Sequence, residues 1–556
     1  MTFTDRLANR GSISTASYDI ENSCRFEDTA DVLTYTYSGE PTSQKIGTMS
    51  IWFKRSQILG NIGLFQFGDD GSGDYFATRI TAHQDGGAAK SQLFYRSKIS
   101  GTESTIGGSA AAIRDVSAWY HLVIAIDTTQ GTVANRFKPY LNGVEIPFGN
   151  TMVDNRSLIT QNVDMVIGEN GKYVLIGEGV YKWDGYIADV HYVDGQQLAA
   201  SDFGETDQDS GIWKPKKYGG TYGNNGFFLE FKETGTSANS SGIGADTSGN
   251  GHHFTLTSID ANNQTTDTPT NNFATLNSND HPDTAATYSE GNLRAAGGRE
   301  NCCTMHITSG KWYYEWKVTD FGSGGYTTAY CGLLSYLYPT GTFGDTGGVG
   351  NWGYKDPVAT AGDPITMGFR LYPGSHSCFK NSNDGASSNS MTGGQDFTFV
   401  AGTIIRVCID YDNGAYWLGA WEGSPNSGNG SYIGGDGTEN NGHGWLNHGA
   451  SAGQSNPATG AYPSIGTGSA GTAQGRSTQD GSQSDASLLT TVPGPVRIWQ
   501  HVYAGSNNSV VQLNYGNPPY TWSGSSYADA NGYGKFQYEP PSGFYALCSK
   551  NLAEFG

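Results

Sequence analysis

The sequence has few charged residues, a shortage of basic ones and no long apolar run. Only 15% of its 556 residues are charged, and 52 Asp and Glu outnumber 32 Lys and Arg, which gives a formal net charge of −20. This charge repels polyanions at long range and disfavours a nucleic-acid partner. No apolar run reaches about 18 residues, and residues 1–10 lack the basic and apolar regions of a secretory signal. We therefore expect no membrane insertion.

Cysteine is scarce and scattered. The seven thiols are spaced like neither a zinc motif nor a disulfide framework. We expect reduced and mostly buried thiols, which fits synthesis in a reducing cytoplasm. They are Cys24, Cys302, Cys303, Cys331, Cys378, Cys408 and Cys548.

Glycine and aromatic residues, by contrast, are abundant. The chain holds 80 Gly, 33 Tyr, 24 Phe and 12 Trp. Together with the low charge, this composition is typical of an all-β protein with many loops. The length exceeds that of one ordinary domain, so two or three domains with full cores are expected.

The first half of the chain contains several short apolar segments bounded by turn residues. Residues 119–127 are rich in β-branched and aromatic types and predict a buried strand. Asn142-Gly143 then predicts a tight hairpin, because both residues tolerate a positive φ. A short helical turn is expected at residues 198–203. Further strands are predicted at residues 48–53, 63–67, 75–80 and 92–97.

The order of the 119–127 strand, the Asn142-Gly143 hairpin, Ile167-Gly168 and the segment 183–190 resembles the laminin G and concanavalin A-like sandwich family. The resemblance implies a β-sandwich of the jelly-roll type over residues 19–215. It also implies a binding module rather than an enzyme.

Residues 216–289 change character and are interpreted as a polar bridge with one strand, at residues 227–231. Within this bridge, residues 246–253 look like the Asp-x-Ser-Gly-Asn-Gly turn of many laminin G-like lectin domains.

Four ordered blocks of the second half, residues 310–318, 402–414, 511–516 and 540–548, resemble the SPRY domain. The resemblance implies a second bent sandwich over residues 290–556, which would bind partners through loops. A tract of Gly, Ser, Asn and Thr at 424–493 departs from the family pattern. It cannot bury much apolar area, so we expect an extended surface loop or a segment ordered by neighbouring subunits.

The whole chain, from its opening residues 3–15 through the two sandwiches to the ending 547–552, resembles structural proteins of marine bacteriophages. This implies a protein made in the host bacterial cytoplasm and displayed on the virion surface as a tail fibre, a receptor-binding protein or a head decoration. Its partners would be other virion proteins, further copies of itself, and host cell-surface carbohydrate. Residues 1–18 are interpreted as a tether to the particle or as a frayed terminus.

An enzymatic role is not expected. The Glu-x-Asp-x-x-Glu strand signature of sandwich glycosidases does not occur. Asp184, Asp189 and Asp194 are five residues apart, a spacing that alternates faces in a strand and assembles no carboxylate pair. A tail-associated polysaccharide depolymerase is kept as a minor alternative.

Two acidic turns are candidates for calcium, which prefers oxygen ligands on flexible backbone. One contains Asp69, Asp70 and Asp74, and the other contains Asp246 and Asn250. Calcium is a possible ligand and not a required cofactor. The alternative is a structural role, because Asp side chains brace tight turns as readily as they bind metal.

Aromatic residues in glycine-rich loops are candidates for stacking on a sugar ring. Each could instead cap a sandwich end or pack at a subunit interface. The candidates are Tyr218, Tyr222, Trp352, Tyr354, Tyr372, Trp445 and Tyr462. The tryptophans within apolar strand patterns are expected in the core instead, namely Trp52, Trp119, Trp312, Trp316, Trp417 and Trp499.

Overall fold

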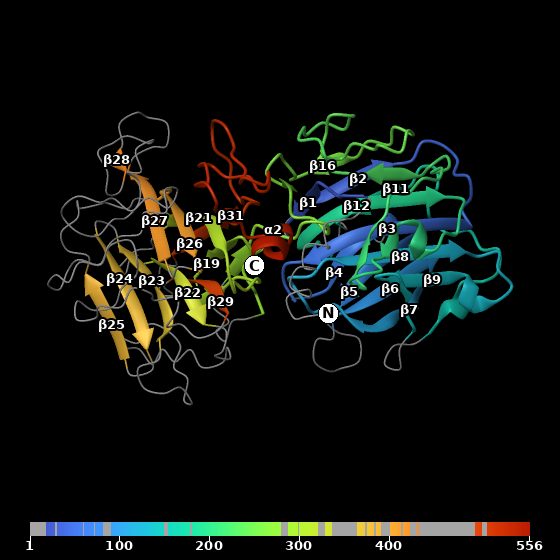
Figure 1. Ribbon diagram of the computed structural model, residues 1–556. Helices are drawn as coiled ribbons and strands as arrows, with labels where there is room; N and C mark the ends of the chain where they lie inside the picture. Colours follow the sequence, from blue (N-terminus) through green and yellow to red (C-terminus); the bar gives the residue numbers. More distant parts are fainter. Residues whose placement is uncertain are drawn as a thin grey trace. The chain divides into compact units, whose positions relative to one another are not determined.

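The chain forms two compact units, Met1–Asn272 and Phe273–Gly556, in a computed structural model (Figure 1). Both units consist of strands, with only short helices. The structure describes residues 18–27, 30–58, 60–69, 71, 73–81, 91–148, 154–177, 181–279, 287–297, 300–320, 329–335, 364–372, 375–382, 385–390, 401–412, 415–422, 431–432, 495–502 and 509–556.

The first unit contains two antiparallel sheets. Sheet 1 has the order β10-β9-β8-β3-β12-β1-β17, and β15 also pairs with β12. Its strands are β10 (Val144–Glu145), β9 (Phe137–Leu141), β8 (Tyr120–Asp127), β3 (Ile46–Arg55), β12 (Gly185–Asp194), β1 (Ser23–Phe26), β17 (Gln264–Thr265) and β15 (Phe227–Leu229).

Sheet 2 has the order β16-β2-β11-β4-β5-β6-β7. Its strands are β16 (Thr255–Thr257), β2 (Val32–Thr36), β11 (Tyr173–Ile176), β4 (Ile62–Gly68), β5 (Tyr75–Thr81), β6 (Gln92–Ile99) and β7 (Thr102–Ala112). The described part of the unit also contains a separate hairpin and three single turns of 3-10 helix. They are β13 (Gly204–Thr206), β14 (Trp213–Pro215), η2 (Val133–Asn135), η3 (Arg156–Leu158) and η4 (Ala200–Asp202).

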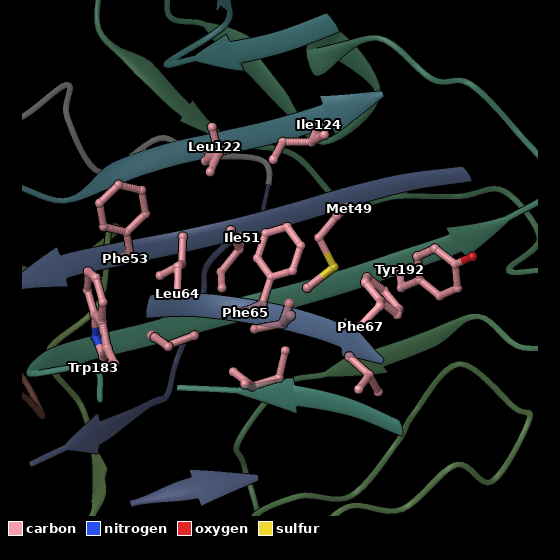
Figure 2. Close-up of a cluster of buried hydrophobic side chains, with 14 of the residues drawn as sticks. Met49, Ile51, Phe53, Leu64, Phe65, Phe67, Leu122, Ile124, Trp183 and Tyr192 are labelled. Carbon is pink, nitrogen blue, oxygen red and sulfur yellow. The ribbon is translucent and has the colours of Figure 1, made fainter. Parts of the chain in front are cut away.

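The core of the first unit lies between its two sheets (Figure 2). Met49, Ile51 and Phe53 alternate along β3, so all three point to the same face, where they meet side chains of sheet 2 such as Phe65 and Phe67. This alternation explains why the strand segments can be predicted from the sequence. The hairpin at Asn142-Gly143 is also confirmed, with φ angles of 48° and 82°.

The opposite, outer face of sheet 1 is also buried, but its side chains are mixed in polarity. Ser50, Trp52 and Lys54 project from β3 and are each 3% exposed or less. Segments that follow β12 cover them: the loop from η4 to residue 222, and residues 265–272. This outer face therefore carries buried polar groups that need partners from the covering segments.

The boundary between the units differs from the sequence-based interpretation, which placed a bridge at residues 216–289. Three short strands of this segment, β15, β16 and β17, pair with β12, β2 and β1 and so extend both sheets of the first unit. The first unit therefore ends at Asn272. Strands of two or three residues are too short to show the alternation that a sequence pattern requires.

The second unit is also built from two sheets. Sheet 3 has the order β18-β19-β30-β21-β26-β27-β28, with β31 parallel to β21. Its strands are β18 (Thr287–Ser289), β19 (Arg294–Ala296), β30 (Val510–Asn514), β21 (Lys311–Asp320), β26 (Ile404–Asp410), β27 (Ala415–Glu422), β28 (Ser431–Tyr432) and β31 (Tyr545–Ala546).

Sheet 4 has the order β20-β29-β22-β23-β24-β25. Its strands are β20 (Glu300–Cys302), β29 (Val496–Val502), β22 (Ala329–Ser335), β23 (Pro364–Tyr372), β24 (Ser375–Ser382) and β25 (Gly385–Ser390). The chain ends in a short helix, α2 (Ser549–Phe555).

Alternation along β21 again separates the two faces of a sheet. Trp312, Tyr314 and Trp316 lie in the core between sheets 3 and 4. Tyr313 and Glu315 point to the outer face of sheet 3, where residues 515–548 cover them. Both units are thus sandwiches, and in each of them irregular chain covers, or roofs, the outer face of one sheet. The predicted all-β class with two sandwiches is confirmed.

The predicted core tryptophans mostly lie where expected. Trp52, Trp312, Trp316 and Trp499 are 3% exposed or less, whereas Trp119 is half-buried at the edge of the outer face of sheet 1. The side chain of Trp417 and nearly all of the predicted insertion 424–493 lie outside the described residues. Six of the seven cysteines are described as buried free thiols. Among the described residues, no helix has the length and apolar character needed to span a membrane.

Candidate functional site

An open hollow of about 610 Å³ lies beside the β13–β14 hairpin, on the chain that covers the outer face of sheet 1. It combines one aromatic side chain with charges of both signs. The lining includes Glu205, Asp207, Asp209, Trp213, Lys214 and Lys216.

Trp213 is the aromatic residue of the hollow, and its indole is held from two sides. The Nε1–H donates a hydrogen bond to His121 Nδ1 at 3.0 Å. Gly143 and Gly204 lie so close to the ring that a Cβ at either position would overlap it. The ring is nevertheless only partly buried. The hollow therefore offers a rigid indole that needs no reordering to meet a ligand.

His121, on β8, holds the Trp213 indole in place. Its ring stacks on Trp52 with 4.5 Å between centroids, and its Nε2 lies 2.8 Å from Ser50 Oγ. Burial lowers the pKa of His121 to about 3, so the imidazole is neutral at ordinary pH. Because Nδ1 accepts from Trp213, Nε2 carries the proton and donates it to Ser50.

The charges of the hollow are fixed by a tight turn. The Asp207 carboxylate accepts hydrogen bonds from Ser210 N and Oγ, both at 2.9 Å, and from Lys214 Nζ at 3.1 Å. These bonds lower the pKa of Asp207 to about 2. Lys214 also lies 3.5 Å from Glu205, and Lys216 Nζ donates to Ser201 O. At neutral pH the Asp207 carboxylate is thus ionised, and Lys214 is held between Asp207 and Glu205.

The predicted aromatic ligands Tyr218 and Tyr222 do not face this hollow as free rings. The Tyr218 ring stacks on Phe203 at 5.0 Å, and its hydroxyl donates to Thr221 O. The Tyr222 hydroxyl lies 2.8 Å from His191 Nδ1. Both rings are half-buried on the outer face of sheet 1, where they pack against the chain that covers it.

A second buried cluster holds the same covering chain. His191 Nε2 lies 3.0 Å from one oxygen of Asp189, and the Tyr18 hydroxyl donates to the other at 2.8 Å. Asp189 has a φ of 50°, within the bulge where β12 and β3 change register. The bulge turns the carboxylate toward His191, two residues along the same strand. Burial beside Asp189 raises the pKa of Tyr18.

The other two carboxylates of this region are also engaged separately. Asp194 accepts from the backbone N–H groups of Thr42, Ser43 and Asn225, and Asp184 accepts from Gln57. Each carboxylate in the Asp184, Asp189 and Asp194 series therefore has its own partners.

The carboxylates of the first candidate calcium turn already accept hydrogen bonds, within the turn and from the turn between β6 and β7. Asp69 Oδ1 accepts from Gly71 N, and both Asp74 oxygens accept from the backbone at Ser100 and Gly101, at 2.6 and 2.8 Å. Asp70 lies outside the described residues.

The second candidate turn is braced in the same way. The Asp246 carboxylate accepts four hydrogen bonds, from Phe228 N, from Ser248 N and Oγ, and from His252 N. Asn250 Nδ2 donates to Gly223 O and Gly226 O. Within the described part of the chain, no group of three or more His, Cys, Asp or Glu could hold a metal ion. Calcium binding stays a prediction.

Trp352, Tyr354, Trp445 and Tyr462 lie outside the described residues, and Tyr372 ends β23 with its side chain outside them. Sequence reasoning missed Trp213, His121 and the charged turn. One signal was present, because Trp213-Lys214-Pro215 places an aromatic residue in a polar segment directly after the Asp207–Ser210 turn.

A laminin G family model, described as the concanavalin A-like lectin/glucanases superfamily, matches residues 29–201. The first unit contains a concanavalin A-like domain. The match covers less than half of the chain, and the hollow lies just beyond its end, on the segment that closes this concanavalin A-like domain.

Several solved structures are similar to parts of the chain. The CBM40 of the Ruminococcus gnavus IT-sialidase, bound to α2,3 sialyllactose, is 19% identical, over 30% of this chain and 85% of that one, with a TM-score of 0.22. A putative carbohydrate binding protein from Bacteroides ovatus is 16% identical, over 44% and 59%, with a TM-score of 0.28. The TRIM65 PSpry domain is 10% identical, over 43% and 91%, with a TM-score of 0.22. No curated protein matches the chain in sequence.

Proposed function

We propose that this protein is a non-enzymatic bacteriophage virion surface protein, of the tail-fibre or receptor-binding type, whose first unit binds a host-surface glycan in the Trp213 hollow. The observation that carries the proposal is the rigid, partly exposed indole next to fixed charges on a concanavalin A-like domain. The virion part of the proposal is supported by the resemblance of the sequence to phage structural proteins.

The chemistry of the hollow suits a sugar. The apolar face of a pyranose ring can pack on the Trp213 indole. Its hydroxyls can donate to the carboxylates of Glu205 and Asp209 and can accept from Lys216. The hollow is open, so a single contact would be weak. Several copies on one particle would raise the overall affinity through effective concentration.

The ionised state of Asp207 supports binding without hydrolysis. A glycosidase acid needs a raised pKa, so that it still holds a proton at working pH. Asp207 has a pKa of about 2 and is bonded to Ser210 and Lys214, so it has no proton to give. A tail-associated depolymerase remains the minor alternative, and it would release reducing sugar from host polysaccharide.

The binding proposal is tested by applying the full chain to an array of bacterial surface glycans, followed by calorimetry with the glycan that binds. The Glu205→Gln and Asp209→Asn variants change charge but not size. We expect each to weaken binding about tenfold. The control is Tyr527→Ala, because Tyr527 is a 40% exposed aromatic residue of the second unit. Equal affinities for all four proteins would refute the hollow as the site.

The alternative is a head or capsid decoration that recognises no host molecule. Labelling whole virions with an antibody against this chain, and using the same antibody in an adsorption assay, separates the two roles. Label at the tail with blocked adsorption supports attachment. Label on the head with normal adsorption would make the protein a decoration.

A further inference from the structure

A row of two lysines and two aromatic rings lies on the outer face of sheet 3, with one lysine on β21 and the other three residues on the chain that covers this face. Lys317 Nζ is 4.5 Å from the centre of the Tyr520 ring. The Tyr520 and Trp522 rings are 5.9 Å apart, and Lys535 Nζ is 5.8 Å from the Trp522 ring. We call Lys317, Tyr520, Trp522 and Lys535 the lysine–aromatic row.

The row is anchored by a buried carboxylate. Tyr520 is 7% exposed, and its hydroxyl donates to Glu315 at 3.3 Å. Glu315 is fully buried and also accepts from the backbone N–H groups of Gln537 and Tyr538. The Trp522 indole N–H donates to Ser525 O at 2.9 Å. The two rings are therefore held in place before any ligand arrives.

The two lysines of the row have no carboxylate partner among the described residues. Their ammonium groups lie over the aromatic rings, whereas Lys311, on the same strand as Lys317, pairs with Asp410 at 3.1 Å. Lys317 is half-buried, and burial lowers its pKa. A charged group in this setting gains more from an incoming anion than a fully hydrated one, because part of its desolvation has already occurred.

We propose that the lysine–aromatic row is a second binding site, one that takes an acidic oligosaccharide such as a chain of uronates. The ammonium groups of Lys317 and Lys535 would pair with sugar carboxylates. The exposed part of Trp522 would pack against the C–H face of a sugar ring. This site lies in the second unit, uses none of the residues of the Trp213 hollow and does not depend on that hollow binding a glycan.

The net charge of −20 does not prevent this binding. At about 0.15 M salt, charges more than about 8 Å apart are largely screened, so the local pair of lysines decides the interaction. Single-stranded nucleic acid is the competing ligand, because it also combines anions with stacking rings. It normally needs a groove of cations that follows the backbone, and the row offers two.

The test is calorimetry of the full chain with oligogalacturonate, with a neutral malto-oligosaccharide and an oligothymidylate of similar length as comparisons. We expect binding of oligogalacturonate alone, weakened by added salt. Lys535→Gln should reduce the affinity about tenfold and flatten the salt dependence. Trp522→Ala should also weaken binding, and Lys217→Gln, an exposed lysine of the first unit, should not.

Each other outcome overturns the proposal. Absence of oligogalacturonate binding, or equal affinity in Lys535→Gln, would remove the row as an anion site. Tighter binding of oligothymidylate would make it a nucleic-acid surface. Loss of binding in Asp209→Asn but not in Lys535→Gln would place the acidic sugar in the Trp213 hollow. That result would leave the proposed function of the first unit intact.

Discussion

The two units solve one structural problem with different chemistry. In each, irregular chain roofs the outer face of a sheet and holds a partly exposed tryptophan. In the first unit a neutral imidazole, His121, holds Trp213. In the second unit a buried carboxylate, Glu315, holds Tyr520 beside Trp522. The neighbouring lysines differ as well, since Lys214 pairs with carboxylates and Lys535 does not. The comparison suggests that each roof is set by one buried polar anchor, which can be removed.

Removing the anchor of the second unit should give the largest effect. Glu315→Ala removes the carboxylate that accepts from five donors: Tyr313 Oη, Tyr520 Oη, Asn514 Nδ2 and two backbone N–H groups. Of these, Asn514 Nδ2 keeps a second acceptor, Lys535 O. We expect a loss of about 4 kcal/mol in the free energy of unfolding of this unit, measured by urea titration. Glu539→Ala, at an exposed position of the same segment, should change it by less than about 0.5 kcal/mol. Similar losses in both variants would contradict the anchoring role.

The ion pair under the roof of the first unit should give the next largest effect. Lys54 Nζ lies 2.9 Å from Asp267, which also accepts from Trp119 Nε1, and both charges are at most 1% exposed. Lys54→Met leaves a buried carboxylate without its cation and should cost about 3 kcal/mol. Lys232→Met, at a half-exposed lysine near Glu230, serves as the control. If Lys54→Met unfolds with the same free energy as the parent chain, residues 265–272 are not held through this ion pair.

The two anchors should respond to pH in opposite directions. Burial lowers the pKa of His121 from 6.5 to about 3, so the unfolded state binds a proton that the folded state does not. The first unit should therefore lose stability as pH falls from about 6.5 toward 3, by up to about 1.4 kcal/mol per pH unit. Burial raises the pKa of Glu315, so the second unit should lose stability as pH rises through that pKa.

Thermal unfolding followed between pH 3 and 7 would check this opposition. Above about pH 4, His121→Gln should flatten the slope of the first unit, apart from a smaller contribution from His252, whose pKa is also lowered by burial. At lower pH Asp207 also contributes, because its hydrogen bonds lower its pKa from 3.8 to about 2. Glu315→Gln should flatten the slope of the second unit. Parallel slopes in both units, unchanged by these variants, would remove the pH contrast.

Calcium should produce the smallest effect. The oxygens of Asp246 and Asp74 already accept backbone and side-chain hydrogen bonds, and a metal ion would have to displace them. We therefore expect a chelator to leave the melting temperature unchanged within about 1 °C. A clear fall, abolished in Asp246→Asn, would show that the turn is a calcium site.

Local patterns were sufficient for much of the fold. The long strands β3 and β21 alternate their side chains between two faces, and β8 is a continuous run of apolar residues. Asn142-Gly143 has the φ angles that a tight hairpin needs. The closing strands β15, β16 and β17 have two or three residues each, so their place is set by pairing partners more than 30 residues away.

The Trp213 hollow could not be predicted from the sequence for a related reason. His121, Gly143 and Gly204 come from three separate segments, and only the folded sheet brings them to Trp213. Tyr218 and Tyr222 are stacking candidates in the sequence because glycines surround them, and the sequence leaves a packing role open for each. The outer face of sheet 1 is apolar enough at Phe203 and Phe228 to bury much of both rings.

The late strands β15, β16 and β17 determine where this protein can be cut. A fragment ending at residue 215 would leave β12, β2 and β1 each without one neighbour, and open sheet edges promote aggregation. A fragment ending at Asn272 retains all three. The concanavalin A-like unit with its complete C-terminal segment is therefore the smallest piece that we would expect to express alone or to graft onto another scaffold.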